Sequence, residues 1–454
     1  MGKWLYDDAM YRFDVPERSY WEASAGESDL AADPLLGNET CDVAVIGGGY
    51  TGLAAAYHLT KDHQLDVRVL EAGHIGWGAS GRNGGFCSVG GEGMGAEAMI
   101  RKYGVDNTRD YYRAQVAAVE LVRDIIVEEK IDAQRHGSGE VSIACSPGGF
   151  RWLKEHAEFQ FRVLGLDTSV LQKEQVRDTC FDSPVQHGAA TLQPTFGLHP
   201  LRYVRGLASA AKKHGAVIHP RSEVIAWSKN DGLHELRTAG GMIRAKNVVV
   251  ATNGFAPEHL NGQIKGRALP MISAIVVTRP LSDDELSRHA WQTSSPTITS
   301  VNLLNYFRLL PDGRFMFGGR GSANGNERSA ARNYRDLVAR MHQLFPEWRD
   351  VEITHRWHGL VCMNRRLAPA IGRFQDDPSI FFGFGYHGNG VNTATWTGQQ
   401  IARWLVAGGA TGSKAPSSVP SVVLGMPDRF PLAAFRLQYI RGALAWLRMV
   451  DRFD

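Results

Sequence analysis

Residues 42–72 read DVAVIGGGYTGLAAAYHLTKDHQLDVRVLEA. The short apolar run at 42–46 is typical of a buried parallel strand. A glycine-rich turn follows it and opens a helix rich in Ala and Leu, after which DVRVLEAG at 66–73 has the pattern of a second strand. We therefore predict a compact β-α-β unit that begins near residue 42.

The turn between this first strand and the helix, the first glycine turn, matches the spacing G-x-G-x-x-G. Gly47 permits the tight turn, Gly49 lets the backbone approach a pyrophosphate, and Gly52 lets the helix pack closely on the strand. Phosphate groups are favoured there because the free N–H groups and the dipole of a helix N-terminus attract negative charge. Tyr50 and Thr51 lie inside the motif and are therefore expected cofactor contacts as well.

Glu71 ends the second strand, 19 residues after Gly52. A carboxylate at this place can accept hydrogen bonds from a ribose diol, and it repels the extra 2′-phosphate of NADP. An ordinary tight turn is the alternative interpretation of the glycines alone. The order of strand, motif, helix, strand and terminal Glu71 favours a dinucleotide site, which we expect to include the neighbouring Ala72.

Two further glycine-rich turns favour FAD over NAD. The second glycine turn, ASGRNGG at 79–85, follows the β-α-β unit and supplies donors from Arg82 and Asn83. The third glycine turn, GFGYHGNGVN at 383–392, opens a helix whose N-terminus can stabilise the N1/C2=O edge of a reduced flavin. Because a bare NAD domain needs neither turn, we predict FAD and add these contacts: Ser80, Arg82, Asn83, Gly84, Gly85, Gly388, Asn389, Gly390 and Val391.

Composition places the 454-residue chain among ordinary globular proteins, with about two domains. Hydrophobic residues make up 43% and charged residues 21%, and the net charge of +3 is too small to indicate nucleic-acid binding. Five scattered cysteines without a CxxC pair indicate a reduced intracellular chain, and we expect neither disulfides nor a metal site. Without a signal-peptide pattern or a membrane-spanning apolar run, we expect a protein of the cytoplasm or its membrane face.

Strand–helix units at both ends of the chain flank a middle part with antiparallel-looking strands. Periodicity predicts helices at 105–130, 149–164, 199–214, 328–345 and 392–407, and strands that include 139–145, 246–251 and 380–385. We expect an α/β (α+β) fold in which a Rossmann-like FAD-binding domain (41–100, 195–262 and 360–408) is interleaved with an antiparallel-sheet substrate domain (101–194 and 263–359). An aromatic-rich arm (1–40), packed on the body or covering the active site, precedes them. A loose linker and a C-terminal helix follow at 409–454.

Six segments together carry a family resemblance: SYWEAS (19–24), DVAVIGGGYTGLAAAYHL (42–59), GASGRNGG (78–85), VVVATNG (248–254), WHGLVCMNRRLAPAIGR (357–373) and GYHGNGVNTATWTGQQIA (385–402). The chain resembles the FAD-dependent amine and amino-acid oxidoreductases of the D-amino-acid oxidase superfamily. Within it, the gamma-glutamylputrescine oxidoreductase-like proteins are the most similar. The resemblance spans about residues 20–405. It implies an FAD domain of the glutathione-reductase type and adds three cofactor contacts, Val224, Ala251 and Thr252.

The resemblance implies oxidation of a C–N bond by hydride transfer to flavin N5, giving an imine that water hydrolyses. Such chemistry requires a neutral amine, correct orientation and a dry pocket rather than a catalytic dyad. Oxygen is the expected electron acceptor, with release of H2O2. The alternatives are a membrane-associated dehydrogenase that passes electrons to quinone or a carrier, a 2-hydroxy-acid oxidoreductase on the same fold, and a non-catalytic flavoprotein.

Candidate substrate contacts come from the predicted strands at 306–320 and from the third glycine turn. Tyr306, Arg308 and Arg320 lie on adjacent apolar strands, and Arg320 can hold a substrate carboxylate with two hydrogen bonds. A structural salt bridge is the alternative role for Arg320. His387 can position the substrate, and a turn residue bonded to backbone is the alternative role for it.

Departures from the family pattern bear on the flavin linkage and on the substrate. Sarcosine-oxidase relatives attach the flavin through a Cys, and the matching position here is Gly359, about three residues before Cys362. Relatives with a His tether carry it just before the second glycine turn, where only His74 is near, so we expect non-covalent FAD. Asn392 stands where sarcosine oxidases hold the substrate carboxylate with a Lys, which argues against a simple amino-acid substrate.

The last segment, 430–454, has the pattern of an amphipathic helix. At about 100° per residue, one face carries Leu432, Tyr439, Ile440, Ala443, Leu444, Leu447 and Val450, and another carries Arg441, Arg448 and Arg452. Basic amphipathic helices can lie in a membrane interface, held by apolar burial and anionic lipid. Packing on the catalytic body, or a dimer contact, is the alternative.

Overall fold

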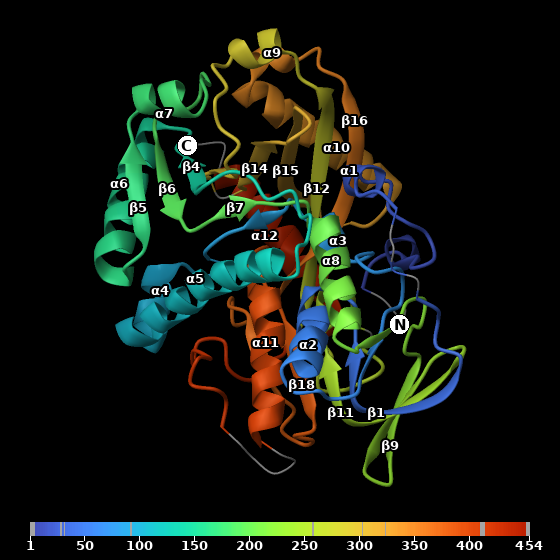
Figure 1. Cartoon of the computed structure of the whole chain (residues 1–454). Helices are drawn as coiled ribbons and strands as arrows, with labels where there is room; N and C mark the ends of the chain where they lie inside the picture. Colours follow the sequence, from blue (N-terminus) through green and yellow to red (C-terminus); the bar gives the residue numbers. More distant parts are fainter. Residues whose placement is uncertain are drawn as a thin grey trace.

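Two large sheets organise the chain in the computed structural model, which describes residues 5–27, 30, 32–90, 93–256, 258–301, 303–322, 324–408 and 414–450. One sheet is mainly parallel and lies in the lower part of Figure 1. The other is mainly antiparallel and lies in the upper part. The expected mixed fold, a Rossmann-like sheet interleaved in sequence with an antiparallel sheet, is therefore confirmed. The domain boundaries proposed from the sequence stay predictions.

The parallel sheet has the strand order β17-β18-β11-β1-β2-β8. Its strands are β1 (Gly37–Ile46), β2 (Val67–Leu70), β8 (Val217–His219), β11 (Gly241–Val250), β17 (Ala370–Arg373) and β18 (Ile380–Phe384). Of these six strands only β17 runs antiparallel to its neighbour. Two further antiparallel strands, β9 (Ala226–Asn230) and β10 (Leu233–Arg237), extend the sheet beside β11.

Three helices cover one face of the parallel sheet: α2 (Tyr50–Lys61), α8 (Pro200–Lys213) and α11 (Gly390–Gly408). A fourth helix, α5 (Val105–Glu128), packs on α11. Helix α2 is buried from Tyr50 to Thr60 because it is packed between neighbours, which explains its Ala-rich sequence. Helices α2 and α11 lie side by side (Figure 1). A Cβ at Gly398 of α11 would come within 2.4 Å of the Thr51 carbonyl oxygen, so a glycine is required for this close approach.

The antiparallel sheet has the order β16-β12-β15-β14-β13-β4-β6-β5. Its strands are β4 (Glu140–Ile143), β5 (Asp167–Leu171), β6 (Ala189–Gln193), β12 (Leu269–Pro280), β13 (Thr297–Thr299), β14 (Asn305–Leu309), β15 (Arg314–Ser322) and β16 (Ile353–Met363). One pair, β13 with β4, is parallel. Helix α10 (Glu327–Leu344) packs on β12 and β15 over an aromatic core of Phe181, Phe307, Phe315, Phe317, Phe345 and Trp348.

Smaller elements complete the body. They are η1 (Asp8–Tyr11), α1 (Tyr20–Ser24), α3 (Ala79–Arg82), β3 (Phe86–Cys87), α4 (Ala96–Tyr103), α6 (Pro147–Phe159), η2 (Gln160–Leu164), α7 (Lys173–Thr179), β7 (Phe196–Gly197), η3 (Asn253–Phe255), α9 (Asp283–Ser287), η4 (Pro346–Trp348), η6 (Ala433–Phe435) and α12 (Leu437–Val450). The helix predicted at 149–164 is α6 continued by one π-helical turn, η2.

The described part of the N-terminal arm packs on the body. Tyr6 donates a hydrogen bond to the Pro270 carbonyl (2.7 Å), and the Trp21 indole donates to the Asn83 carbonyl (2.9 Å). Trp21 is among the most deeply buried side chains. Phe13, from the same arm, lines the large cavity described below. The described part of the arm therefore packs on the body, and Phe13 contributes to the wall of the cavity.

The C-terminal segment differs from the prediction in two ways. The expected loose linker is wrong for 414–428, because Val422 and Val423 are buried and the Val423 carbonyl accepts a hydrogen bond from Ile371 N (3.0 Å). Residues 409–413 lie outside the described residues. The predicted apolar face of the helix is also wrong in part, because Leu432 and Tyr439 are exposed.

Helix α12 packs on the antiparallel sheet through two side chains of the predicted face. Ile440 and Leu444 are buried with Leu269 and Met271 of β12 and with Leu303. The side chains of Leu447, Arg448 and Val450, and all of Arg452, lie outside the described residues. The alternative of packing on the body of the protein accounts for this face. No helix in the described ranges has the length and apolar character needed to cross a membrane.

Candidate functional site

A large cavity is lined by residues of both sheets and of all three glycine turns. It encloses about 2200 Å³ of atom-free space, part of which is open to solvent. The parallel sheet contributes the carboxyl ends of β1, β2 and β11, where open α/β folds usually bind their ligands. The antiparallel sheet contributes β4, β12, β14, β15 and β16. A long ligand in this cavity therefore reaches from one sheet to the other.

The first glycine turn is held by backbone contacts that exclude side chains. Gly47 has φ +108°, and a Cβ there would lie 2.8 Å from the Ala251 carbonyl oxygen at the end of β11. A Cβ at Gly52 would lie 2.0 Å from the Gly47 carbonyl oxygen, so helix α2 begins hard against the turn. Gly49 faces Ser80 of the second turn, whose Oγ would be 2.9 Å from an added Cβ. Glycine at these places keeps side chains out of the space beside the turn, so a ligand can approach the backbone there.

Glu71 lies at the end of β2 and lines the cavity. Its two carboxylate oxygens accept hydrogen bonds from Gly48 N (2.7 Å) and Gly73 N (2.9 Å). Burial raises the pKa of Glu71, and these backbone hydrogen bonds oppose the shift. The carboxylate is thus fixed beside the first glycine turn, with lone pairs left to accept from a ribose.

The second glycine turn is built by its own side chains. Ser80 Oγ accepts from Tyr50 N (3.0 Å), and the Asn83 amide donates to the Ala79 and Ser80 carbonyls. Arg82 lines the cavity, but its Nε donates to the Trp77 carbonyl (2.6 Å) and its Nη1 to Glu17 of the arm (2.8 Å).

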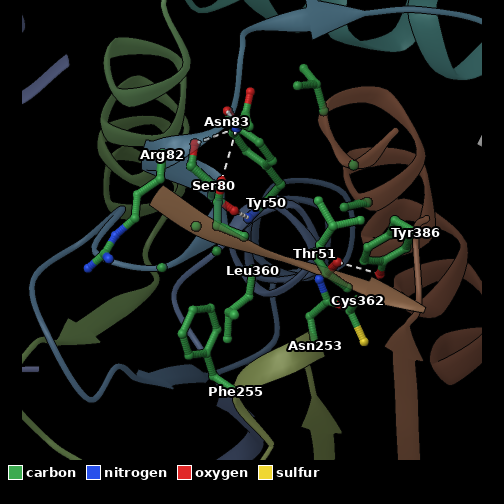
Figure 2. Close-up of a pocket in the computed structure, with 18 of the residues that line it drawn as sticks. Tyr50, Thr51, Ser80, Arg82, Asn83, Asn253, Phe255, Leu360, Cys362 and Tyr386 are labelled. Atoms are coloured by element: carbon green, nitrogen blue, oxygen red, sulfur yellow. Dashed lines mark hydrogen bonds between the residues drawn. The ribbon is translucent and has the colours of Figure 1, made fainter. Parts of the chain in front are cut away.

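Figure 2 shows the Arg82 guanidinium pointing away from Tyr50 and Ser80. We predicted Arg82 and Asn83 as donors to the cofactor. In this structure most of those donors bind the chain itself, because the turn needs them to close and to hold the arm.

The third glycine turn is joined to the first by hydrogen bonds. Tyr386 Oη lies 2.6 Å from Thr51 Oγ1, a contact drawn in Figure 2. His387 has φ +54°, and its backbone N donates to the Cys362 carbonyl (3.0 Å). Asn389 donates through Nδ2 to the Ser88 carbonyl (2.6 Å), which ties the turn to the segment after the second turn.

The structure brings nearly all the predicted site residues to this one cavity. Those that line it are Gly47, Gly49, Tyr50, Thr51, Glu71, Ala72, Ser80, Arg82, Asn83, Gly84, Val224, Ala251, Thr252, Tyr306, Arg320, His387, Gly388, Asn389, Gly390 and Val391. Gly52 and Gly85 do not line it. They allow close packing instead, since a Cβ at Gly85 would lie 2.0 Å from the Leu198 carbonyl oxygen.

Three candidate substrate residues gather where the antiparallel sheet meets the third turn. Arg320 donates through Nη2 to the His387 carbonyl (2.9 Å), and Tyr306 Oη lies 3.1 Å from Ser273 Oγ. Burial and the Arg320 charge lower the pKa of His387 to about 3, so its imidazole is neutral. Neither ring nitrogen of His387 has a hydrogen-bond partner among the described residues.

Arg308, the other candidate, is a structural residue. It is fully buried, and its guanidinium donates to the Gly84 carbonyl (3.1 Å) and the Leu198 carbonyl (2.6 Å). Asn392 is also fully buried and does not line the cavity. Arg308 therefore supports the second turn from behind, whereas the side-chain amide of Asn392 has no hydrogen-bond partner among the described residues.

Several cavity residues were missed from the sequence. Asn253 accepts a hydrogen bond from Gly385 N (2.9 Å), and Phe13 comes from the arm. Asn253 lies inside the VVVATNG segment and Phe13 inside the aromatic arm, but neither pattern singled out its side chain as a cavity residue. Glu140 did carry a signal, because it is a charged residue at the start of an otherwise apolar strand.

The positions of the possible flavin tethers offer little nucleophilic chemistry. Gly359 lines the cavity but has no side chain, and Cys362 lines it with a thiol whose pKa is raised by burial to about 12. A thiol of this kind is a poor nucleophile because little thiolate is present. His74 lies 2.7 Å from Glu22 of the arm.

Comparison with known proteins places these features in a family. The model of the FAD dependent oxidoreductase family DAO matches residues 42–404. This chain belongs to that family.

Among relatives, gamma-glutamylputrescine oxidoreductase of Escherichia coli (strain K12) is 30% identical over 93% of this chain and 96% of the relative. Glycine oxidase of Bacillus licheniformis is 25% identical over 80% of this chain and 93% of the relative. The structure of glycine oxidase from Geobacillus kaustophilus has the same fold, with TM-score 0.67 and 22% identity over 85% of this chain and 100% of that chain. The structure of L-amino acid deaminase from Proteus myxofaciens also has this fold, with TM-score 0.69 and 17% identity over 90% of this chain and 97% of that chain.

The DAO-family cavity fits FAD on its own geometry. The first glycine turn is a backbone cradle that a Cβ at Gly47 would fill, as a pyrophosphate site requires. Glu71 would hold the ribose, and the N-terminus of α11, beginning at Gly390, would face the flavin ring. The unpartnered nitrogens of His387 lie at that end of the cavity.

We expect Glu71→Ala to weaken FAD binding by roughly 1–3 kcal/mol, the usual cost of losing a charge-assisted hydrogen bond. Fluorescence titration of apoprotein with FAD measures this change. Glu71→Gln keeps the size of the side chain and one acceptor oxygen. Its FAD affinity should therefore lie between those of the wild-type protein and Glu71→Ala. Glu39→Ala is the matched control, because Glu39 lies on β1 and pairs with Arg68 away from the cavity. An unchanged FAD affinity in Glu71→Ala would show that Glu71 is not the ribose ligand.

Proposed function

We propose that this DAO-family enzyme oxidises a C–N bond of an amine or amino acid. The observation that carries the proposal is the group formed by Tyr306, Arg320 and His387, which lines the cavity beside the third glycine turn. A cationic Arg320 next to a neutral His387 suits a substrate with a carboxylate and an amine. The names of the relatives, gamma-glutamylputrescine oxidoreductase and glycine oxidase, support the same substrate class.

The side chains of the cavity bind and orient rather than perform acid–base chemistry on a dyad. Bound FAD supplies the acceptor for a hydride from the substrate carbon. Arg320 would hold a carboxylate, and the apolar side chains of Leu360 and Ile275 would exclude water. Burial raises the pKa of Tyr306 to about 12, so its hydroxyl stays protonated and can donate. A γ-glutamylated polyamine is one candidate substrate, with α-amino acids as the others.

The electron acceptor is oxygen in our preferred interpretation, with an imine that water hydrolyses and H2O2 as the second product. A quinone or carrier-linked dehydrogenase is the alternative. Peroxide release during turnover supports the oxidase, and activity only with artificial acceptors supports the dehydrogenase. All five cysteines are free, which supports our expectation of a cytoplasmic protein.

Anaerobic addition of amines and amino acids should bleach the flavin absorbance if the proposed reaction is correct. Arg320→Ala should slow this reduction or raise KM for substrates with a carboxylate, because the guanidinium that holds the carboxylate is removed. The matched control is Arg279→Ala, because Arg279 lies at the far end of β12 and does not line the cavity. Arg308 is unsuitable for this purpose because it supports the second turn. Failure of every amine to reduce the flavin would contradict the proposal and favour the hydroxy-acid or non-catalytic alternatives.

We expect FAD to be bound without a covalent link. Acid precipitation of the yellow protein should leave FAD in the supernatant, since Gly359 has no nucleophile and the Cys362 thiol is buried. Absorbance of the supernatant at the flavin bands measures release. Flavin that stays with the pellet would point to Cys362, and Cys362→Ala would then have to release it.

A peripheral membrane contact through the C-terminal segment remains part of the proposal. Leu432, Phe435 and Trp446 are 76%, 64% and 59% exposed, whereas Ile440 and Leu444 of the same segment are buried. Basic residues beside such side chains favour anionic lipid by about 1 kcal/mol each.

In a flotation assay, wild-type protein should therefore rise with anionic vesicles at low salt. The triple variant Leu432→Ser, Phe435→Ser, Trp446→Ser should not rise. This variant is a better control than truncation at 428, because truncation also uncovers Leu269 and Met271. Equal behaviour of the two proteins would remove the membrane contact from the proposal.

A further inference from the structure

Glu140 is a buried carboxyl group that faces the cavity without a cationic partner. It opens β4, is 8% exposed and lines the cavity. Its Oε2 accepts a hydrogen bond from Ser88 Oγ (2.6 Å). Within the described ranges, no Lys, Arg or His lies close enough to form an ion pair with it, and none perturbs its titration.

Such a group is energetically unfavourable unless something binds it. A buried carboxylate that lacks a counter-charge is disfavoured, and burial raises the pKa of Glu140 to about 7. A structural role would be served by a neutral side chain such as Gln, which also bonds Ser88. A carboxylate facing a ligand cavity is instead suited to pair with a cation that the ligand brings.

Arg320 is the opposite charge in the same cavity, and it too lacks an ionic partner among the described residues. Its recorded side-chain hydrogen bond goes to the His387 carbonyl, and burial lowers its pKa. Glu140 and Arg320 do not pair with each other, although a direct ion pair would relieve both of them. A carboxyl group and a guanidinium that line one cavity without pairing therefore define two separate binding positions.

Both positions are fixed to the third glycine turn. Glu140 holds Ser88, whose carbonyl accepts from Asn389, and Arg320 holds the His387 carbonyl. Since His387 and Asn389 are two residues apart, both groups are tied to the same short stretch of the cavity wall. The supporting strands, β4 and β15, belong to the same antiparallel sheet.

We propose that Glu140 binds an ammonium group of the substrate, while Arg320 binds a carboxylate at a different position. The inference rests on the proposed function, because it names the substrate class of that site: molecules that carry a cationic amine and a carboxylate separated along one chain. It assigns to Glu140 a specificity role that the sequence alone did not.

The test is binding of matched ligands to FAD-loaded protein, read from perturbation of the flavin absorbance or, where the flavin is reduced, from the concentration dependence of anaerobic reduction. The probes are butylamine, butanoate, and a series of ω-amino acids from glycine to 6-aminohexanoate. Wild-type protein should bind one member of the series more tightly than either butylamine or butanoate.

Glu140→Gln should weaken the binding of butylamine and of the tightest-binding ω-amino acid by about tenfold or more, since a buried charge pair is lost. Butanoate should be unaffected. Arg320→Gln should show the reverse pattern, weakening butanoate and leaving butylamine unchanged. Glu140→Gln keeps the size and the Ser88 hydrogen bond, and unchanged FAD content reports intact folding. Glu235→Gln is the matched control, because Glu235 is a buried carboxyl on β10 outside the cavity.

A Glu140→Gln protein that binds butylamine and the ω-amino acids as wild type does would overturn the inference. So would a wild-type protein that binds neither. The proposed function is judged separately, by whether any amine bleaches the flavin of wild-type protein. Normal bleaching with unaltered ligand binding in Glu140→Gln therefore rejects the role of Glu140 alone.

Discussion

The contact between Gly47 and Ala251 is the constraint on which the site depends. It joins the end of β1 to the end of β11, and a single added carbon at Gly47 would lie 2.8 Å from the Ala251 carbonyl oxygen. Because Gly52 closes on the same turn at the start of α2, strand, helix and neighbouring strand are locked at one point. No side chain fills the space where the end of β1, the start of α2 and the end of β11 meet, and this leaves room for the cavity.

The sequence predicted this part of the molecule well because its signals are local. The strand at 42–46, the glycine spacing and Glu71 all lie within one β-α-β unit, and each is dictated by short-range geometry. The opposite wall of the cavity depends on the pairing of strands distant in sequence. Phe13 of the arm likewise reaches the cavity only through the tertiary arrangement, and no periodicity marks it.

Predictions that rested on charge or periodicity alone failed for physical reasons visible in the structure. Arg82 was expected to serve the cofactor, yet Glu17 competes for its guanidinium and uses it to anchor the arm. Leu432 was placed on an apolar face by helical periodicity, yet α12 begins only at Leu437. The segment 414–428 has the composition of a linker, but Val422 and Val423 are buried and Val423 is hydrogen-bonded to β17.

The central place of β11 has a consequence for how the protein is made. This strand pairs with β1 on one side and with β18 on the other, so three stretches separated by roughly two hundred and one hundred and thirty residues form one sheet. Helix α11, which closes the site, follows β18. A growing chain on the ribosome thus carries the first glycine turn early but completes the pocket only after α11 has been synthesised. Cofactor capture is therefore a late event in biosynthesis, and until then the apolar strands of an unfinished sheet are exposed to the cell's chaperones.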